Sequence, residues 1–152
     1  MERPLVVTDP SEQAPTLIRE AGELAESLDV PLRVLTVVTR EEFEEDAKVL
    51  DSVAMTERQS YHMEHEGYAE DVAETAVNDL LRDLDIDTTP IGRAVDGDGD
   101  RAAAILDEAE SAACDYIFMT GRRRSPTGKA VFGDTAQRVI LNFDGYVVTL
   151  TD

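Results

Sequence analysis

Residues 120–135 read TGRRRSPTGKAVFGDT and place three consecutive arginines between glycines, in a chain whose formal net charge is -19. The stretch follows directly on a short apolar run, YIFMT, at residues 116–120, which is the pattern of a buried strand. Beyond the loop, apolar side chains recur at helical spacing over residues 135–143. The segment therefore predicts a strand, a glycine-rich basic loop and a helix in succession.

Strands and helices alternate along the remainder of the chain as well. Apolar runs predict further strands at residues 4–9, 32–38, 88–95 and 145–151, and Pro90 suits the edge of a sheet. Helical spacing predicts helices at residues 11–28, 68–84 and 102–113, whereas the acidic residues 39–67 predict partial helix with a mobile loop. This alternation predicts an α/β fold in one domain, residues 1–152. Its sheet is expected to be open, doubly wound, five-stranded and mainly parallel, with helices on both faces.

The acidic composition excludes some classes of partner. Lys+Arg total 14 against 33 Asp+Glu, and Lys48 and Lys129 are the only lysines. Such a surface repels nucleic acids and anionic membranes, whose binding depends on neutralised phosphates, so neither is predicted as a partner. The composition favours a halophilic protein, because the Debye length falls to about 3 Å in molar salt; the alternative is an ordinary solvated surface.

The cysteine content and the hydropathy favour a cytoplasmic protein. The single cysteine, Cys114, cannot form an internal disulfide, and its position before an apolar strand predicts a packing residue rather than a nucleophile. No N-terminal stretch has the pattern of a signal peptide, and no apolar run approaches the roughly 20 residues of a transmembrane helix. We therefore expect a cytoplasmic location.

The basic loop lies where ligands bind to open parallel sheets, beyond the carboxyl end of a strand. Its glycines let backbone N–H groups approach an anion, the helix start adds N–H donors, and arginine suits phosphate contacts. The loop therefore predicts an anion site; the alternative is that the arginines pair with acidic neighbours. It is not a P-loop, because Arg123 replaces the first glycine and Ala130 replaces the hydroxyl residue that holds magnesium.

Glycines bracket the loop in a particular order. Gly121 and a basic stretch precede Gly133-Asp134-Thr135, which open a helix that leads to a short final strand. This order resembles the signature of the universal stress protein family: glycine, two residues, glycine, nine residues, then glycine with serine or threonine. Similarity extends to the strand ending in Asp9 and to residues 35–38, 114–117 and 145–150. The resemblance, to a haloarchaeal type of member, implies a Rossmann-like fold of the adenine nucleotide alpha hydrolase type, a role in stress response, and a homodimer paired through the C-terminal strand.

The resemblance also implies a set of pocket residues, carried over position by position. They are Asp9, Val38, Gly121, Arg122, Arg124, Gly133, Asp134 and Thr135. The implied ligand is ATP, AMP or another anion, with no metal other than magnesium carried by the nucleotide. The loop departs from the signature, because Arg124 takes the place of the second glycine, the loop is one residue shorter, and Asp134 replaces the hydroxyl residue.

The carboxylate of Asp134 leaves two functions open. Asp134 and Gln137 predict a capping pair at the start of the last helix, in which the carboxylate competes with phosphate for the helix N–H donors while the arginines attract phosphate. The leading hypothesis is a regulatory domain that binds nucleotide, and the alternative is a dimeric protein-interaction module that binds none. An enzyme such as a slow ATP hydrolase ranks third, because neither a general base nor a magnesium ligand set is evident, and no catalytic residue is predicted.

Two further motifs are weighed as metal sites. His62 and His65 lie three residues apart, but zinc sites need three or four ligands, so we expect a solvated helix surface and no metal there. The DGDGD run at residues 96–100 resembles a calcium loop, yet Arg101 stands where that loop requires glycine. We expect a turn, with Asp100 as the N-cap of the next helix.

Overall fold

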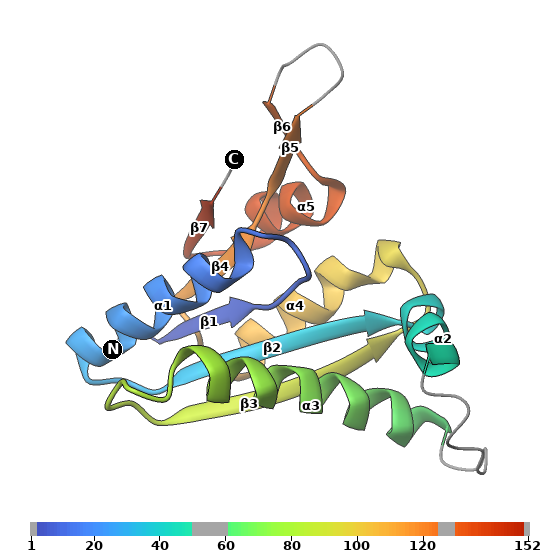
Figure 1. Ribbon diagram of the computed structural model, residues 1–152. Helices are drawn as coiled ribbons and strands as arrows, with labels where there is room; N and C mark the ends of the chain where they lie inside the picture. The colour runs from blue at the N-terminus through green and yellow to red at the C-terminus, as the bar shows by residue number, and fades with distance from the viewer. Residues whose placement is uncertain (1–2, 50–60, 125–129, 151–152) are drawn as a thin grey trace.

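The computed structural model describes residues 3–49, 61–124 and 130–150, with the backbone alone at residues 46–49, 61–64, 122–124 and 130–132 (Figure 1). The main strands are β1 (Pro4–Val7), β2 (Leu32–Thr39), β3 (Thr88–Val95), β4 (Tyr116–Thr120) and β7 (Tyr146–Leu150). The helices are α1 (Ala14–Leu28), α2 (Arg40–Val49), α3 (Tyr61–Leu80), the 3-10 turn η2 (Asp98–Asp100), α4 (Arg101–Ser111) and α5 (Asp134–Asn142). Two short strands, β5 (Arg122–Arg124) and β6 (Ala130–Phe132), stand outside the main sheet.

The main sheet is five-stranded, in the order β3-β2-β1-β4-β7, and each neighbouring pair runs parallel. The chain winds outward from β1 in both directions, which confirms the predicted doubly wound, Rossmann-like α/β fold. β3 forms one edge, as Pro90 predicts, and β7 forms the other. The order of strands reverses beside β1, so the carboxyl ends of β1 and its neighbours are where such sheets bind ligands.

Two layers of helices cover the sheet (Figure 1). α1 and α3 lie on one face, and Val6 and Val34 belong to the apolar cluster there. α4 and α5 lie on the other face, where Leu5 and Leu35 belong to the second cluster. Successive strand residues point to opposite faces, so continuous apolar runs of this kind supply both layers of the core.

Gly92 brings α3 and β3 into direct backbone contact. A Cβ at this position would lie 2.5 Å from the carbonyl oxygen of Glu66 and 2.7 Å from the carbonyl carbon of Ala69, and closer still to the backbone nitrogen of Glu70. All three atoms belong to the backbone of α3, which cannot rotate away as a side chain can. The absence of a side chain at residue 92 therefore sets how closely this helix approaches the sheet.

The acidic stretch after β2 contains more helix than its composition predicts. Thr39 and Glu42 form a capping box: the Glu42 N–H donates to the Thr39 hydroxyl over 3.1 Å, and the Thr39 N–H donates to the Glu42 carboxylate over 3.0 Å. α2 therefore starts immediately after the strand. α3 spans Tyr61–Leu80 rather than residues 68–84. Of the stretch 39–67, where partial helix with a mobile loop was predicted, residues 50–60 lie outside the described residues. No helix in the described part of the chain is long and apolar enough to cross a membrane.

The arginine stretch is a strand rather than an open loop. β5 pairs antiparallel with β6, in the register Arg122↔Phe132, Arg123↔Val131 and Arg124↔Ala130. Figure 1 shows this hairpin rising away from the main sheet beyond β4. Part of the arginine backbone therefore forms ladder hydrogen bonds with β6.

The start of α5 differs from the predicted capping pair. Gly133 is the N-cap residue, and it has no side chain that caps the helix; Asp134 is already the first helical residue. The prediction that Asp134 and Gln137 cap this helix is therefore wrong, because the helix starts one residue earlier than an Asp134 cap requires. The carboxylate of Asp134 still lies in the first turn, where the helix dipole favours negative charge.

Candidate ligand-binding site

A cavity of about 590 Å³ opens at the carboxyl ends of β1 and β2, between α1 and α3, with α2 along one side. Its volume lies within the range of about 300–1,000 Å³ that is typical of small-molecule sites. The residues that line it are Thr8, Asp9, Pro10, Ser11, Ala14, Pro15, Ile18, Thr36, Val37, Val38, Glu42, Glu45, Tyr68, Val72, Thr75, Ala76, Leu80 and Arg101.

Most of the cavity wall is apolar. Ile18 of α1, Val38 of β2 and three residues of α3, Val72, Ala76 and Leu80, contribute aliphatic surface. A wall of this kind suits the flat face of an aromatic ring. Burying that face away from water is favourable and requires no polar partner.

Hydroxyl groups and one carboxylate form the polar part of the wall near β1. The Thr8 and Thr36 hydroxyls share a hydrogen bond of 2.6 Å between neighbouring strands, and both residues are buried. Asp9 accepts a hydrogen bond of 2.7 Å from the Ser11 backbone N–H and a second one from the Thr120 hydroxyl at the end of β4. These bonds fix the orientation of the Asp9 carboxylate at the point where the strand order reverses.

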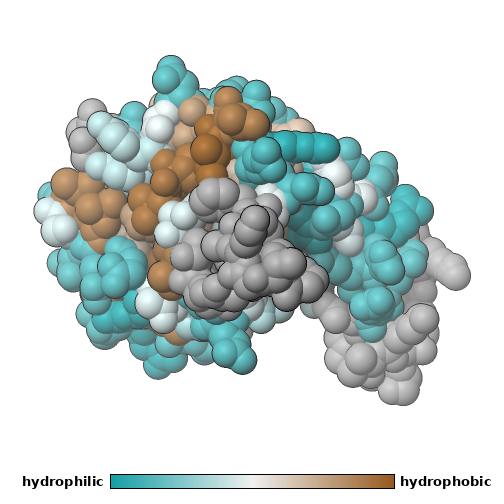
Figure 2. Space-filling model, turned by 90° about the horizontal axis from the view of Figure 1, so that it is seen from above, coloured by the Kyte–Doolittle hydropathy of each residue, from teal (hydrophilic) through white to brown (hydrophobic). Residues whose placement is uncertain are grey.

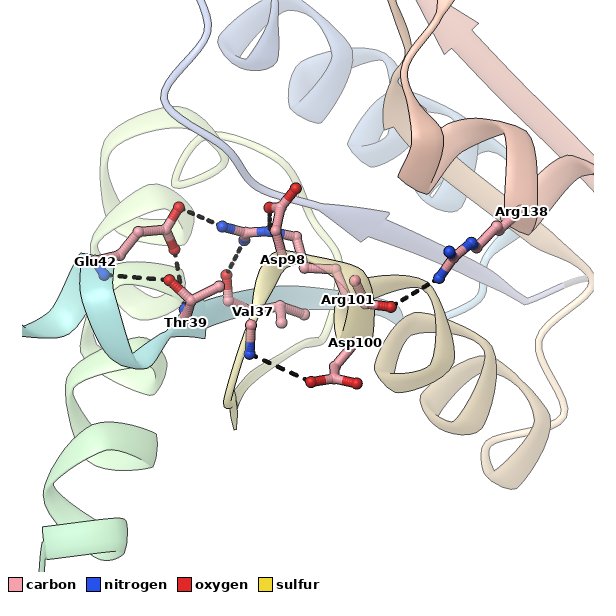
Figure 3. A network of polar contacts seen from close by, with 9 residues as sticks. Val37, Thr39, Glu42, Asp98, Asp100, Arg101 and Arg138 are labelled. Carbon is pink, nitrogen blue, oxygen red and sulfur yellow. Dashed lines mark hydrogen bonds and ion pairs between the residues drawn. The ribbon is translucent and has the colours of Figure 1, made fainter.

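Arg101, at the start of α4, also lines the cavity. It belongs to a polar network, which Figure 3 shows from close by. Its Nη1–H donates to the Val37 carbonyl oxygen over 2.8 Å, its Nε–H donates to Asp98 over 2.6 Å, and its Nη2–H donates to Glu42. Burial opposes the charge of Arg101, but the hydrogen bonds to Asp98 and Glu42 outweigh that effect and raise its pKa. The guanidinium is thus charged, and its donors are directed at protein groups.

The network extends from Arg101 to two neighbouring elements. The Gly97 N–H donates to the Asp100 carboxylate over 3.2 Å, and Arg138 of α5 donates to the Gly99 carbonyl oxygen over 2.8 Å (Figure 3). Asp100 is the N-cap residue of α4, as predicted, but its side chain caps the η2 turn instead of the helix. The η2 turn is therefore linked to the end of β2, the start of α2 and the middle of α5.

The predicted pocket residues divide into two groups. Asp9 and Val38 line the cavity, whereas Gly121, Gly133, Asp134 and Thr135 are not among its lining residues. Arg122 and Arg124 lie on β5, where the structure describes the backbone alone. The Asp9–Thr120 hydrogen bond nevertheless brings Asp9 to the residue that precedes Gly121.

Both loop glycines have partners within the fold. The Gly133 N–H donates to the Gly121 carbonyl oxygen over 3.1 Å. A Cβ on Gly121 would lie 3.2 Å from both the Ala136 Cβ and the Thr149 Cγ2, so this glycine lets α5 and β7 pack closely. In this structure Gly133 therefore does not direct its backbone donor at an anion.

Glu42, Tyr68 and Arg101 are among the cavity residues that were not predicted from the sequence. The Thr39 and Glu42 pair, three residues apart, is a capping-box pattern that would have located the start of α2 and thus Glu42. From the sequence alone, Arg101 is noticeable only because it stands where a calcium loop requires glycine. Its contact with Glu42 joins residues 59 positions apart, which no local pattern can indicate.

His65 and Cys114 belong to the interior. The expectation of a solvated surface is wrong for His65, which is 3% exposed and has its ring centroid 4.0 Å from that of Phe43. The described residues contain no group of three or more side chains able to hold a metal. Cys114 is buried in the core, as predicted, and burial raises the pKa of its thiol, which keeps it in the unreactive neutral form.

Comparison with known proteins identifies the family. Residues 1–149 match the Universal stress protein family. The fold is similar to that of a universal stress protein from Archaeoglobus fulgidus, with TM-score 0.64, 20% identity and 98% of each chain covered. The universal stress protein from the same organism in complex with dAMP gives TM-score 0.59 at 15% identity, over 98% of this chain and 97% of that one.

A universal stress protein in complex with cAMP is also similar, with TM-score 0.54 at 15% identity, over 99% of this chain and 96% of that one. No curated protein matches in sequence. At these identities the structures establish the fold, and the sequence match of residues 1–149 establishes the relationship. The chain belongs to the universal stress protein family.

Proposed function

We propose that the chain is a single regulatory domain of the stress response that binds an adenine nucleotide, such as ATP or AMP, at the carboxyl ends of its strands. The observation that carries this proposal is the apolar cavity that Asp9 and Val38 line. Complexes of similar universal stress proteins with dAMP and cAMP support it. Binding, rather than turnover, is the proposed activity, in a cytoplasm of high salt.

The cavity suggests how the parts of the ligand lie. The base packs among Ile18, Val72 and Ala76, with its edge toward the end of β2 at Val38. The Asp9 carboxylate, which accepts bonds only from Ser11 and Thr120 among the described residues, keeps lone pairs for ribose hydroxyls. The phosphate group then points toward the β4 end and the loop that follows it.

Filling the cavity tests this proposal. Ala76→Phe, in the wall of the cavity, is expected to weaken AMP binding by about tenfold or more, because the larger side chain occupies the space of the base. Ala103→Phe, at an exposed position of α4 outside the cavity, is the matched control and should leave affinity unchanged. Titration calorimetry in molar salt measures both. Wild-type protein that binds neither AMP nor ATP, or equal affinity in the two variants, would contradict the proposal.

An exposed apolar surface favours a second candidate function, a dimeric interaction module. β7 is an edge strand, and large apolar side chains remain exposed on it and on α5: Ile140, Leu141, Tyr146 and Val148. Figure 2 shows an apolar band bordered by hydrophilic surface on the upper side of the molecule. An unprotected edge strand with apolar side chains recruits another strand, so we propose a homodimer paired through β7.

Light scattering at micromolar concentration tests the dimer. The wild type is expected to have the mass of two chains in molar salt, and Tyr146→Lys is expected to have the mass of one, because 62% of that side chain is exposed at the proposed interface. Leu28→Lys, which introduces the same charge at an exposed apolar position of α1, should remain dimeric. A monomeric wild type would exclude this mode of association.

A further inference from the structure

We infer that a pair of buried hydroxyl groups, those of Thr8 and Thr36, selects the base of the ligand by donating a hydrogen bond to one of its unprotonated ring nitrogens. This inference rests on the proposed function and names the groups that recognise the ligand within the same cavity. It is drawn from the position of the two hydroxyls and from the single hydrogen bond that they share.

The two threonines lie where the apolar core ends and the cavity begins. Side chains two residues apart on a strand point to the same face of a sheet, so Thr8 and Thr36 follow Val6 and Val34 on the face that α1 and α3 cover. Both threonines line the cavity, and only 9% of Thr8 and 5% of Thr36 is exposed. The pair therefore belongs to the inner wall of the cavity, away from bulk water.

One hydrogen of this pair has no acceptor in the described part of the protein. Two hydroxyls carry two hydrogens, and the bond of 2.6 Å between their Oγ1 atoms uses one of them. The nearby Asp9 carboxylate accepts from Ser11 and Thr120 instead. A buried hydroxyl hydrogen without an acceptor costs free energy. A ligand that brings an acceptor to the pair recovers this energy, whereas a ligand that brings a C–H group does not.

Adenine supplies an acceptor of this kind. The ring nitrogens that do not bear the sugar are unprotonated, so each of them accepts a hydrogen bond. In the proposed arrangement the base packs among Ile18, Val72 and Ala76, with its edge toward Val38. Thr36 precedes Val38 by two residues on β2 and points to the same face of the sheet, so this edge also lies toward the hydroxyl pair.

Titration calorimetry with adenosine and its 1-deaza, 3-deaza and 7-deaza analogues tests the inference. Each analogue has a C–H group in place of one ring nitrogen and keeps the sugar. All four ligands are uncharged, so the charges of the arginine stretch after β4 do not separate them. We expect the analogue that lacks the nitrogen at the hydroxyl pair to bind about tenfold or more weakly than adenosine. The ratio should be the same at about 0.1 M and 1 M salt, because salt does not screen a bond between neutral groups.

Removing both hydroxyls assigns the lost affinity to the pair. Thr8→Val/Thr36→Val keeps the shape of both side chains, and the ratio of dissociation constants for that analogue and adenosine is expected to fall to within about twofold. The two residues are replaced together, because either hydroxyl alone can still donate to the ligand. Apolar groups of the same shape in place of both partners leave stability nearly unchanged, which thermal melts check.

Two further variants serve as controls. Thr75→Val makes the same chemical change at an exposed residue of α3 that also lines the cavity, where water solvates the hydroxyl, so the ratio should stay as in the wild type. Thr8→Ser/Thr36→Ser keeps both hydroxyls and loses only the methyl groups. It should retain the discrimination between the analogue and adenosine.

The outcomes distinguish this inference from the proposed function. Wild-type protein that binds all three analogues as tightly as adenosine would overturn the inference and leave nucleotide binding intact. So would losses that all persist in Thr8→Val/Thr36→Val, or that Thr75→Val abolishes equally. Failure to bind adenosine and AMP would overturn the proposed function, and this inference with it. A loss for one analogue that Thr8→Val/Thr36→Val abolishes and Thr8→Ser/Thr36→Ser retains would support it.

Discussion

Replacing Gly92 with alanine is expected to destabilise the fold by about 3 kcal/mol or more. The new Cβ would lie within 2.5 Å of the Glu66 carbonyl oxygen and 2.7 Å of the Ala69 carbonyl carbon, and relief requires that α3 move away from β3. That movement also opens the α3 wall of the cavity. Urea denaturation followed by circular dichroism, in molar salt, measures the change in the free energy of unfolding.

Gly67→Ala provides a control of opposite sign within the same helix. A Cβ at Gly67 meets no atom of the described residues within 4 Å, and this glycine lies inside α3. Alanine has the higher helix propensity, so the variant is expected to gain about 0.5–1 kcal/mol of stability. Gly92→Ala that denatures at the same urea concentration as the wild type would show that α3 does not lie against β3 as described.

Replacing Arg101 with methionine is expected to destabilise the protein by about 2–3 kcal/mol. Methionine keeps the aliphatic part of the side chain and removes all three groups of donors, which leaves the Val37 carbonyl oxygen without its partner. It also leaves Glu42 and Asp98 close together without the intervening cation. The start of α2 depends on Glu42, so backbone amides of residues 40–45 should exchange hydrogen faster.

Arg138→Met is the matched control for this change. Arg138 donates to the Gly99 carbonyl oxygen from an exposed position, so its loss is expected to cost less than about 1 kcal/mol and to leave exchange in α2 unaltered. Adding Glu42→Gln to Arg101→Met forms a double-mutant cycle that isolates the pair. Additive effects in that cycle would mean that the contact between Arg101 and Glu42 contributes nothing to stability.

Much of the fold was predictable because the sheet is buried on both faces. Residues 32–38 and 116–120 form continuous apolar runs, which parallel strands between two helix layers require, and Pro90 correctly indicated an edge. The hairpin of β5 and β6 was missed because an arginine run has no strand-like alternation. Gly92 carried only a weak signal, since a glycine inside a strand does not say which backbone approaches it.

Residues of the site were predictable only where they lie at the carboxyl end of a strand. Asp9 follows β1, and Val38 lies near the end of β2, so both are on the ligand side of the sheet. Topology indicated Asp9, whereas Val38 was indicated only by the resemblance to the family. Arg101 and Glu42 meet through contacts across 59 residues, and the ladder between Arg122 and Phe132 depends on pairing that the loop composition conceals. Contacts between charged residues that are far apart in the sequence determine which of those charges remain available to a ligand.

The two edges of the sheet are unlike, and this difference limits how large an assembly can grow. The β3 edge contains Pro90, which has no N–H to donate to a neighbouring strand, whereas the β7 edge exposes Tyr146 and Val148. A sheet whose two edge strands can both pair with a strand of another copy can add copies indefinitely and form a fibre. In the proposed homodimer, two copies that meet across a two-fold axis cover each other's β7 edge, and the described part of the main sheet offers no second edge of this kind for growth beyond the pair.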